Sequence, residues 1–282
     1  MRGSRKGYNW GEMRKSSRRP DLWQILALPF LLFITLPVLA LFLRLSPRDF
    51  LEGVNQRQVL LAIQLSLATS LTTVLLTLLF GTPVAYLLYR PRSRWSRLVD
   101  TLVDLPTVLP PAVAGVALLM AFGRAGLLGG VFSALGFSLP FTTAAVILAQ
   151  TFIAAPLYIK SAALGFAAVD CELKQAAALD GATRWDVFRY IMLPMAWVSV
   201  LSGGVLTWAR ALGEFGATIL FAGNFPGRTQ TMPLAIYIGF ELDLKVALAL
   251  SAILVVFSFI VLAVVKGLLH DRLADRPGQD EY

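Results

Sequence analysis

Arg210 and Glu214 are charged residues within the apolar stretch 195–222. They are four positions apart, so on a helix they share a face and can form an ion pair. Ionisable side chains inside a membrane-spanning segment are costly to bury and usually mark a functional position. Two interpretations are open. The pair could be a pathway wall or gate whose cation attracts an anion, or a structural ion pair near the outer headgroups.

Residues able to catalyse a reaction or to bind a metal are scarce in this chain. The one cysteine, Cys171, and the one histidine, His270, allow neither an intrachain disulfide nor a Cys/His metal cluster. The phosphate-binding motif Gly-x-x-x-x-Gly-Lys-Ser/Thr does not occur. We therefore expect no catalytic residue, no metal site and no cofactor, which argues against a membrane-embedded enzyme.

The composition is that of a membrane protein. Hydrophobic residues make up 57% of the 282 residues, charged residues make up 15%, and the mean hydropathy is +0.69. Soluble domains carry about 25% charged residues, and a membrane-spanning helix needs roughly 20 apolar residues. The pattern predicts an all-α polytopic membrane protein with six transmembrane helices, at about residues 22–43, 58–89, 102–122, 141–160, 195–222 and 243–268.

Basic residues indicate the orientation of these helices. If the N-terminus is cytoplasmic, 18 of the 25 Lys and Arg residues lie in cytoplasmic segments and six lie in external loops. Because cytoplasmic loops are enriched in Lys and Arg, we expect a multi-pass protein with both termini inside. Basic residues that flank the spans and meet anionic lipid headgroups explain the net charge of +8. We therefore expect membrane lipid, and no nucleic acid, as a partner.

The chain is expected to have three regions. Residues 1–21 form a basic cytoplasmic leader, residues 22–269 form the transmembrane domain, and residues 270–282 form a charged cytoplasmic tail too short to fold alone. A polar segment at about 170–194 separates two of the predicted spans within the transmembrane domain.

The third predicted span contains Pro106, Pro110 and Pro111. An interior proline kinks or breaks a helix because it lacks a backbone N–H and its ring clashes with the preceding turn. A broken helix at membrane depth is tolerated where protein or a water-filled cavity covers it. This span therefore either lines a pathway or has an ordinary kink near its cytoplasmic end.

The second predicted span carries a polar stripe. Its hydroxyl and amide side chains could form hydrogen bonds between helices or could line a substrate site. We favour hydrogen bonding between helices for the whole set, which is Gln64, Ser66, Thr69, Ser70, Thr72 and Thr73.

Segment 170–194 predicts two short helices joined by a turn. Residues 173–179 are rich in helix formers, and Gly181 accepts the positive φ of a sharp turn. Thr183 can cap a second helix with Asp186 three residues later, and Pro194 is expected to end that helix. By composition alone the segment could lie on lipid as an amphipathic helix, or a protein outside the bilayer could dock on it.

The spacing in this segment resembles the EAA loop of ABC importer permeases, in which Glu-Ala-Ala is followed by glycine, nine residues and Ile-x-Leu-Pro. Here Gly181 is followed by nine residues and then by Ile191-Met192-Leu193-Pro194. Gln175 stands where the family usually has glutamate, so this position keeps hydrogen bonding but loses the charge. The resemblance implies a cytoplasmic coupling helix that docks on an ATPase through Gln175, Ala176, Ala177, Asp180, Gly181, Ala182, Arg184, Trp185, Phe188, Ile191, Leu193 and Pro194.

Other stretches resemble the permease subunit of molybdate importers, and the resemblance covers about residues 55–269. They are residues 104–115, 123–129, 209–218, 221–224 and 226–237. The run Gly213-Glu-Phe-Gly216 is also similar to sulfate permeases, whereas the run from Gly227 to Pro233 is more like molybdate permeases. The candidate residues of the translocation pathway or gate are Pro110, Pro111, Gly115, Arg210, Gly213, Glu214, Phe215 and Gly216.

The resemblance implies an ABC type I importer-like permease fold in the plasma or inner membrane of a prokaryote. Two copies of the chain would form the pore, two ATPase subunits would hold ATP and Mg, and an extracytoplasmic binding protein would deliver molybdate or tungstate. Alternating access would then move the oxyanion into the cytoplasm. The alternatives are a sulfate or thiosulfate permease of the same class and an ion-coupled secondary transporter.

Overall fold

The computed structural model describes residues 22–90 and 94–274, and every regular element within these ranges is helical. The all-α class is therefore confirmed. The chain separates into two compact units, Met1–Arg44 and Leu45–Tyr282. The predicted leader 1–21 and residues 275–282 of the predicted tail lie outside the described residues, whereas residues 270–274 continue the last helix.

Helix α1, Leu22–Arg44, belongs to the first unit. Its stretch Leu26–Arg44 is long and apolar enough to cross a membrane. Large apolar side chains along it, among them Trp23 and Phe33, are exposed, as suits a helix whose sides face lipid. The first predicted span, 22–43, is confirmed.

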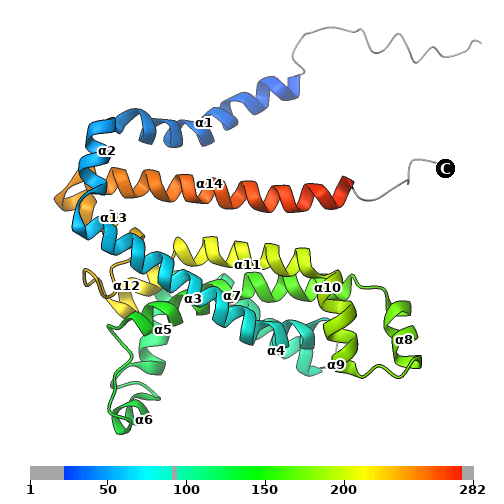
Figure 1. Ribbon diagram of the computed structural model, residues 1–282. Coiled ribbons are helices and arrows are strands. Elements are labelled where there is room, and N and C mark those ends of the chain that lie inside the picture. The colour runs from blue at the N-terminus through cyan, green and yellow to red at the C-terminus, as the bar shows by residue number, and fades with distance from the viewer. Residues whose placement is uncertain (1–21, 91–93, 275–282) are drawn as a thin grey trace, which may run out of the picture. The chain divides into compact units, whose positions relative to one another are not determined.

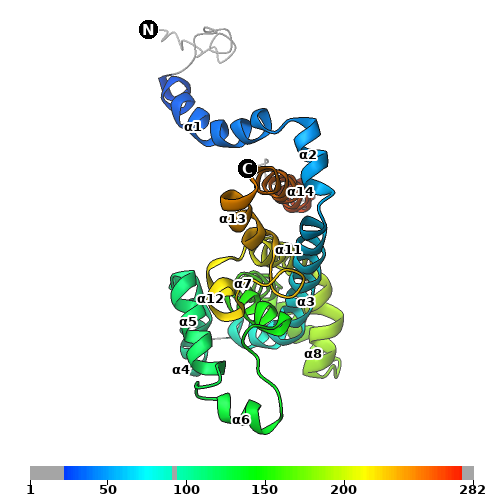
Figure 2. The same cartoon turned by 90° about the vertical axis from the view of Figure 1, so that its left-hand side faces the viewer.

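The second unit is built on three helices that lie side by side in Figures 1 and 2, which are α3 (Arg57–Leu88), α7 (Thr143–Ala167) and α11 (Trp197–Leu212). Glycines let their backbones approach closely. A Cβ added to Gly203 on α11 would lie 2.8 Å from the Cβ of Ser161 on α7. The other helices are α2 (Pro47–Val54), α4 (Arg94–Val108), α5 (Pro111–Phe122), α6 (Gly129–Ala134), α8 (Cys171–Leu179), α9 (Arg184–Val187), α10 (Leu193–Met195), α12 (Gly216–Ala222), α13 (Met232–Leu242) and α14 (Leu244–Ala274).

Three apolar cores hold these helices together. One joins α5, α7 and α12 around Phe221. A second joins α3, α7 and the segment that follows α8 around Tyr158 and Phe166. The third joins α3, α11, α13 and α14 around Leu250. The first core positions the predicted pathway residues, and the second supports segment 170–194.

Four described helices, α1, α3, α7 and α14, are long and apolar enough to cross a membrane, and two bent helix pairs raise the possible number of spans to six. The four match the predicted spans 22–43, 58–89, 141–160 and 243–268. The pairs are α4 with α5, bent by 117°, and Arg184–Met195 with α11, bent by 71°.

Two predicted spans are broken, the third at its prolines as expected and the fifth contrary to expectation. In the third span the helix continues through Pro106 and breaks at Pro110, where the next helix starts with Pro111. The expectation that 195–222 is one continuous span is wrong, because α11 ends at Leu212 and α12 begins at Gly216. The buried Glu214 carboxylate accepts a hydrogen bond from the backbone N–H of Ala217, which stabilises the start of the new helix.

Helices α2 and α13 were not predicted, although both carry a local start signal. Ser46 caps α2 by accepting a hydrogen bond from the N–H of Asp49, and Pro47 occupies its first turn. Thr231 precedes α13, which has Pro233 in its first turn. Proline is favoured at this position because the N–H it lacks has no partner within the helix.

Candidate functional site

Segment 170–194 begins with α8. The side chain of Asp170 caps it by accepting the N–H of Glu172 at 2.9 Å. The helix ends at a glycine turn in which Gly181 has φ +88°, and the N–H of Ala182 donates to the carbonyl oxygen of Ala177 at 2.9 Å. The turn expected at Gly181 is thus present.

The second short helix, α9, begins with the expected capping box. Thr183 Oγ1 accepts the N–H of Asp186 at 3.2 Å, and Asp186 Oδ2 accepts the N–H of Thr183 at 2.9 Å. Both backbone N–H groups have a hydrogen-bond partner within the capping box. The start of α9 is therefore stabilised by hydrogen bonds between residues three positions apart.

The expectation that Pro194 ends this helix is wrong. The chain passes from α9 into a π-helical turn, Phe188–Met192, and then into α10, which contains Pro194. The N–H of Leu193 donates to the carbonyl oxygen of Phe188, five residues back. This wider turn accommodates the proline ring, and the bend of 71° comes only after Met195.

The twelve predicted coupling residues divide into an outer and an inner set. The outer set is exposed and consists of Gln175, Ala176, Asp180, Gly181, Arg184, Trp185 and Pro194. The inner set is half-buried and consists of Ala177, Ala182, Phe188, Ile191 and Leu193. Phe188 packs edge-to-face on Tyr86 and Phe166, so the inner set attaches the loop to α3 and α7.

The outer surface of this loop exposes apolar side chains. Leu179 is 89% exposed, Tyr190 67% and Trp185 63%. Large apolar side chains gathered on an exposed surface commonly mark a docking site for protein or membrane. This geometry fits a surface that a partner covers.

The predicted pathway residues meet at the contact between α5 and α12, which lie beside each other in Figure 2. A Cβ on Gly115 would lie 2.9 Å from the carbonyl oxygen of Ala217, and a Cβ on Gly216 would lie 2.7 Å from the Cβ of Pro111. Both glycines therefore allow backbone contact that no larger residue permits.

The remaining pathway candidates lie at helix breaks: Pro110 lies between α4 and α5, and the others lie at the break between α11 and α12. Pro110 and Gly213 are exposed, and the ring of Phe215 stands 5.4 Å from that of Tyr237. Sequence reasoning thus selected two neighbouring structural features, a tight helix contact and a helix break. Their role in a pathway stays a prediction.

Arg210 and Glu214 form the expected ion pair, with Arg210 Nη1 2.8 Å from Glu214 Oε2. The Glu214 side chain is only 1% exposed, whereas that of Arg210 is 36% exposed. The carboxylate also accepts the N–H of Ala217 at 2.8 Å, so it links the end of α11 to the start of α12. The guanidinium remains partly accessible, which leaves a role in attracting an anion as a prediction.

Three of the six residues of the polar stripe on α3 connect helices, as expected, whereas Thr69 and Thr72 donate to carbonyl oxygens of α3 itself. Ser66 Oγ accepts the N–H of Met232 at 2.7 Å, and Ser70 Oγ accepts the indole N–H of Trp208 at 3.0 Å. Thr73 Oγ1 donates to Gln150 Oε1 at 3.1 Å. These bonds join α3 to the start of α13, to α11 and to α7.

Two ionic clusters were not predicted. Lys160 on α7 contacts Asp104 on α4 at 2.9 Å and also pairs with Asp100. The spacing of the two carboxylates, one helical turn apart, was a signal that sequence reasoning missed. The cluster ties the bent α4 to α7.

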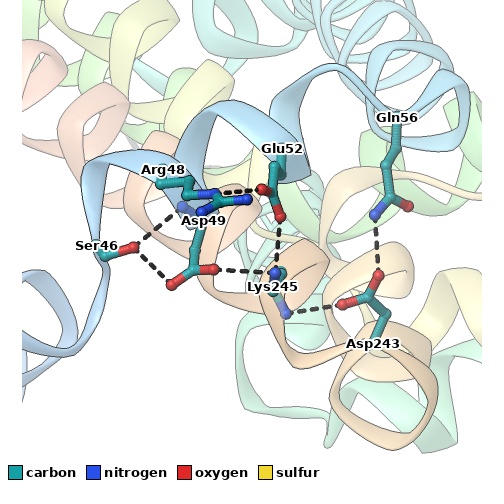
Figure 3. Close-up of polar contacts among 7 residues, drawn as sticks. All are labelled: Ser46, Arg48, Asp49, Glu52, Gln56, Asp243 and Lys245. Atoms are coloured by element: carbon teal, nitrogen blue, oxygen red, sulfur yellow. Dashed lines mark hydrogen bonds and ion pairs between the residues drawn. The ribbon is translucent and has the colours of Figure 1, made fainter.

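Figure 3 shows the other cluster, which joins α2 to the start of α14. Lys245 Nζ lies 3.1 Å from Asp49 and 2.7 Å from Glu52, and Arg48 lies 2.9 Å from Glu52. Hydrogen bonds from Ser46 and Lys245 lower the pKa of Asp49, and those from Lys245 and Arg48 lower the pKa of Glu52. Both carboxylates are therefore held in their charged form.

Among the described residues, no three His, Cys, Asp or Glu side chains gather where they could hold a metal ion. The free cysteine, Cys171, is exposed at the start of α8. The chemistry that this arrangement can provide is docking, close helix contact and electrostatic attraction.

Comparison with known sequences identifies a family. Residues 77–276 match the family described as binding-protein-dependent transport system inner membrane component. The chain is 37% identical over 268 residues to NifC of Clostridium pasteurianum, a probable transport system permease protein, with 94% of each chain covered. It is 40% identical over 235 residues to the molybdenum transport system permease protein ModB of Mycobacterium tuberculosis, covering 83% of this chain and 89% of that one.

Comparison with solved structures supports the fold. A chain of a bacterial alginate ABC transporter, solved with a pentasaccharide-bound periplasmic protein, has a TM-score of 0.65 at 20% identity and covers 95% of this chain. A chain of the MetNI methionine ABC transporter in inward-facing conformations has a TM-score of 0.57 at 18% identity and covers 73% of this chain. The match spans 99% of the alginate-transporter chain and 94% of the MetNI chain.

Proposed function

This chain belongs to the family of binding-protein-dependent transport system inner membrane components, and from that premise we propose that it is the permease subunit of an ATP-driven importer of molybdate or tungstate. The substrate class rests on relatives that carry the name of molybdenum permeases at 40–42% identity. As a permease subunit it is not itself the catalyst.

The observation that carries this proposal is the exposed loop around Gly181. Its backbone is held by a glycine at φ +88° and a capping box, while Leu179 and Trp185 stand outward. An element fixed by local hydrogen bonds, with exposed apolar side chains, suits a mechanical contact. We place the docking surface for a separate ATPase on this loop.

The partners follow from this assignment. Two copies of the chain form the pore, two ATPase subunits supply ATP hydrolysis with Mg, and an extracytoplasmic protein delivers the oxyanion. Both termini and the loop lie on the cytoplasmic side, as the distribution of Lys and Arg favours. Binding of the delivering protein outside and docking of the ATPase inside must influence each other equally, because coupling free energy is reciprocal.

The translocation path in this proposal passes the contact of α5 with α12. The partly exposed guanidinium of Arg210 attracts the oxyanion. The ion pair with Glu214 holds that guanidinium in position. Since a transport path must release its substrate, we expect weak binding there and assign tight binding to the delivering protein.

Uptake by proteoliposomes tests the proposal. The chain is co-reconstituted with the ATPase subunit and the binding protein of its transporter, and entry of radioactive molybdate is measured with and without ATP. We expect uptake that requires ATP and that excess tungstate inhibits more strongly than excess sulfate. Stronger inhibition by sulfate would assign the chain to sulfate import, and uptake driven by an ion gradient without ATP would contradict the proposal.

A further inference from the structure

Two hollows adjoin each other at the ends of α3 and α7, beside loop 170–194. The first has a volume of about 570 Å³, and three cations line it: Arg90, Lys174 and Arg184. Within the described part of the chain, no carboxylate lies within ion-pair distance of these three side chains. Convergent cations without a counter-charge form a site for an anion.

Aromatic side chains hold two of these cations in place. Arg90 Nη2 donates to the hydroxyl oxygen of Tyr86 at 3.0 Å, and its guanidinium carbon lies 4.8 Å from the centre of the Tyr86 ring. Lys174 Nζ lies 5.5 Å from the centre of the Tyr89 ring. These contacts orient the charges without neutralising them, so further N–H donors remain for a ligand.

The second hollow, with a volume of about 560 Å³, has mostly apolar walls and shares Tyr86, Arg90 and Arg184 with the first. It extends along α3 to Leu78, ten residues before the helix ends at Leu88. Ten residues correspond to roughly 15 Å of helix, about half of a ~30 Å hydrocarbon core. The hollow is therefore as long as one leaflet is thick.

We propose that these two hollows together bind one anionic phospholipid. The phosphate lies among Arg90, Lys174 and Arg184, and one acyl chain follows α3 past Pro83 and Leu79. A free phosphate would occupy only the cationic hollow, and a zwitterionic lipid would bring its own cation into it. Because the site joins α3 to both short helices of loop 170–194, the lipid braces that loop against the membrane. The site is independent of which substrate is transported.

Native mass spectrometry of the purified full-length chain tests this proposal. The probes are dioleoyl phosphatidylglycerol, dioleoyl phosphatidylcholine and glycerol phosphate, each titrated separately. We expect tight binding of one phosphatidylglycerol, at least tenfold weaker binding of phosphatidylcholine, and no specific binding of glycerol phosphate. Equal affinity for the two lipids would overturn the proposal, as would binding of glycerol phosphate as strong as that of the lipid.

Variants locate the site. The double variant Arg90→Gln/Lys174→Gln should weaken phosphatidylglycerol binding roughly 25-fold, since each Lys or Arg near an anionic lipid contributes about a fivefold factor. The matched control is Arg94→Gln/Arg189→Gln, which removes the same charge from residues that line neither hollow. Equal losses in both variants would overturn the assignment.

The acyl-chain half of the site has its own variant. Leu79 is 65% exposed on the wall of the apolar hollow, so Leu79→Trp should fill it without disturbing the core. We expect phosphatidylglycerol to bind at least fivefold more weakly, with the unfolding temperature unchanged. Unchanged phosphatidylglycerol binding in this variant would contradict the proposal. Release of the lipid when the ATPase subunits bind would also contradict it, because the cationic hollow would then belong to the interface between the two proteins.

Discussion

At the scale of single residues, two backbone and charge arrangements support the proposed mechanism. Gly181 occupies a conformation that side chains with a Cβ rarely adopt, at the turn between α8 and α9. Glu214 is buried, and its charge is balanced by the partly exposed Arg210. The Gly181 turn and the Arg210–Glu214 pair lead to separate predictions. The first is about transmission of force from the ATPase to the pore, and the second is about attraction of the anion.

Replacing Gly181 with valine should uncouple ATP hydrolysis from transport. A β-branched residue at φ +88° is strained by about 1–3 kcal/mol, so the turn should relax and move α9. We expect uptake to fall at least tenfold while ATP hydrolysis continues. The matched control is Gly136→Val, which imposes the same strain at φ +77° outside the loop and has open space around its Cβ. Normal coupling in the Gly181 variant would contradict the docking role.

Arg210→Ala separates the two interpretations of the ion pair. It leaves the Glu214 carboxylate buried without its cation, which should cost about 1–3 kcal/mol of stability and should reduce uptake. In the double variant Arg210→Ala/Glu214→Gln the unpaired charge is gone, so the unfolding temperature should recover while uptake stays low. If uptake also recovers, the pair is structural only.

At the scale of elements, the positions of the α5–α12 contact and of the α2–α14 cluster depend on residues that no local pattern reveals. Gly115 is tightly confined because the backbone of α12 passes within 3 Å of where its Cβ would stand. The cluster in Figure 3 joins Asp49 and Glu52 to Lys245, far apart in the sequence. Both arrangements can be tested by their effect on stability.

Gly115→Ala should destabilise the protein by about 1–3 kcal/mol, because a methyl group would be forced against the carbonyl oxygen of Ala217. Gly204→Ala is the matched control, since the nearest atom to its Cβ would be 3.9 Å away. Thermal unfolding in detergent measures both. Equal unfolding temperatures for the two variants would count against a tight contact between α5 and α12.

The α2–α14 cluster should weaken in acid. The pKa values of Asp49 and Glu52 are lowered from their ordinary values of 3.8 and 4.5, so the folded state favours the charged carboxylates. Their contribution is fully present above about pH 4.5 and is lost as the pH falls through the lowered pKa values. Thermal unfolding between pH 7 and pH 3 should show a steeper loss for the wild type than for Lys245→Met. Parallel pH curves would mean that the cluster contributes nothing.

Local patterns predicted the elements that depend on nearby residues. The turn at Gly181 and the capping box of Thr183 and Asp186 were predicted because their bonds join residues within a few positions. The break between α11 and α12 was not predicted, since apolar composition continues across it and the buried Glu214 decides it. Pro194 was misjudged because a π-helical turn before it, invisible in the residue pattern, makes room for the ring.

At the scale of the whole molecule, the chain is expected to work only as part of a larger assembly. Its described helices provide an exposed loop at one end of the three-helix core and a close helix contact on the side of that core. We propose that an ATPase on the cytoplasmic side drives the pore through loop 170–194.

Site-specific cross-linking from Cys171 tests whether the ATPase contacts this loop. Cys171 is the only cysteine in the sequence and is exposed at the start of α8. A photoactivatable maleimide attached there in membranes that contain the whole transporter should cross-link the chain to the ATPase subunit, and the label should react in inside-out vesicles only. An adduct with the external binding protein, or labelling from outside the cell, would contradict the account.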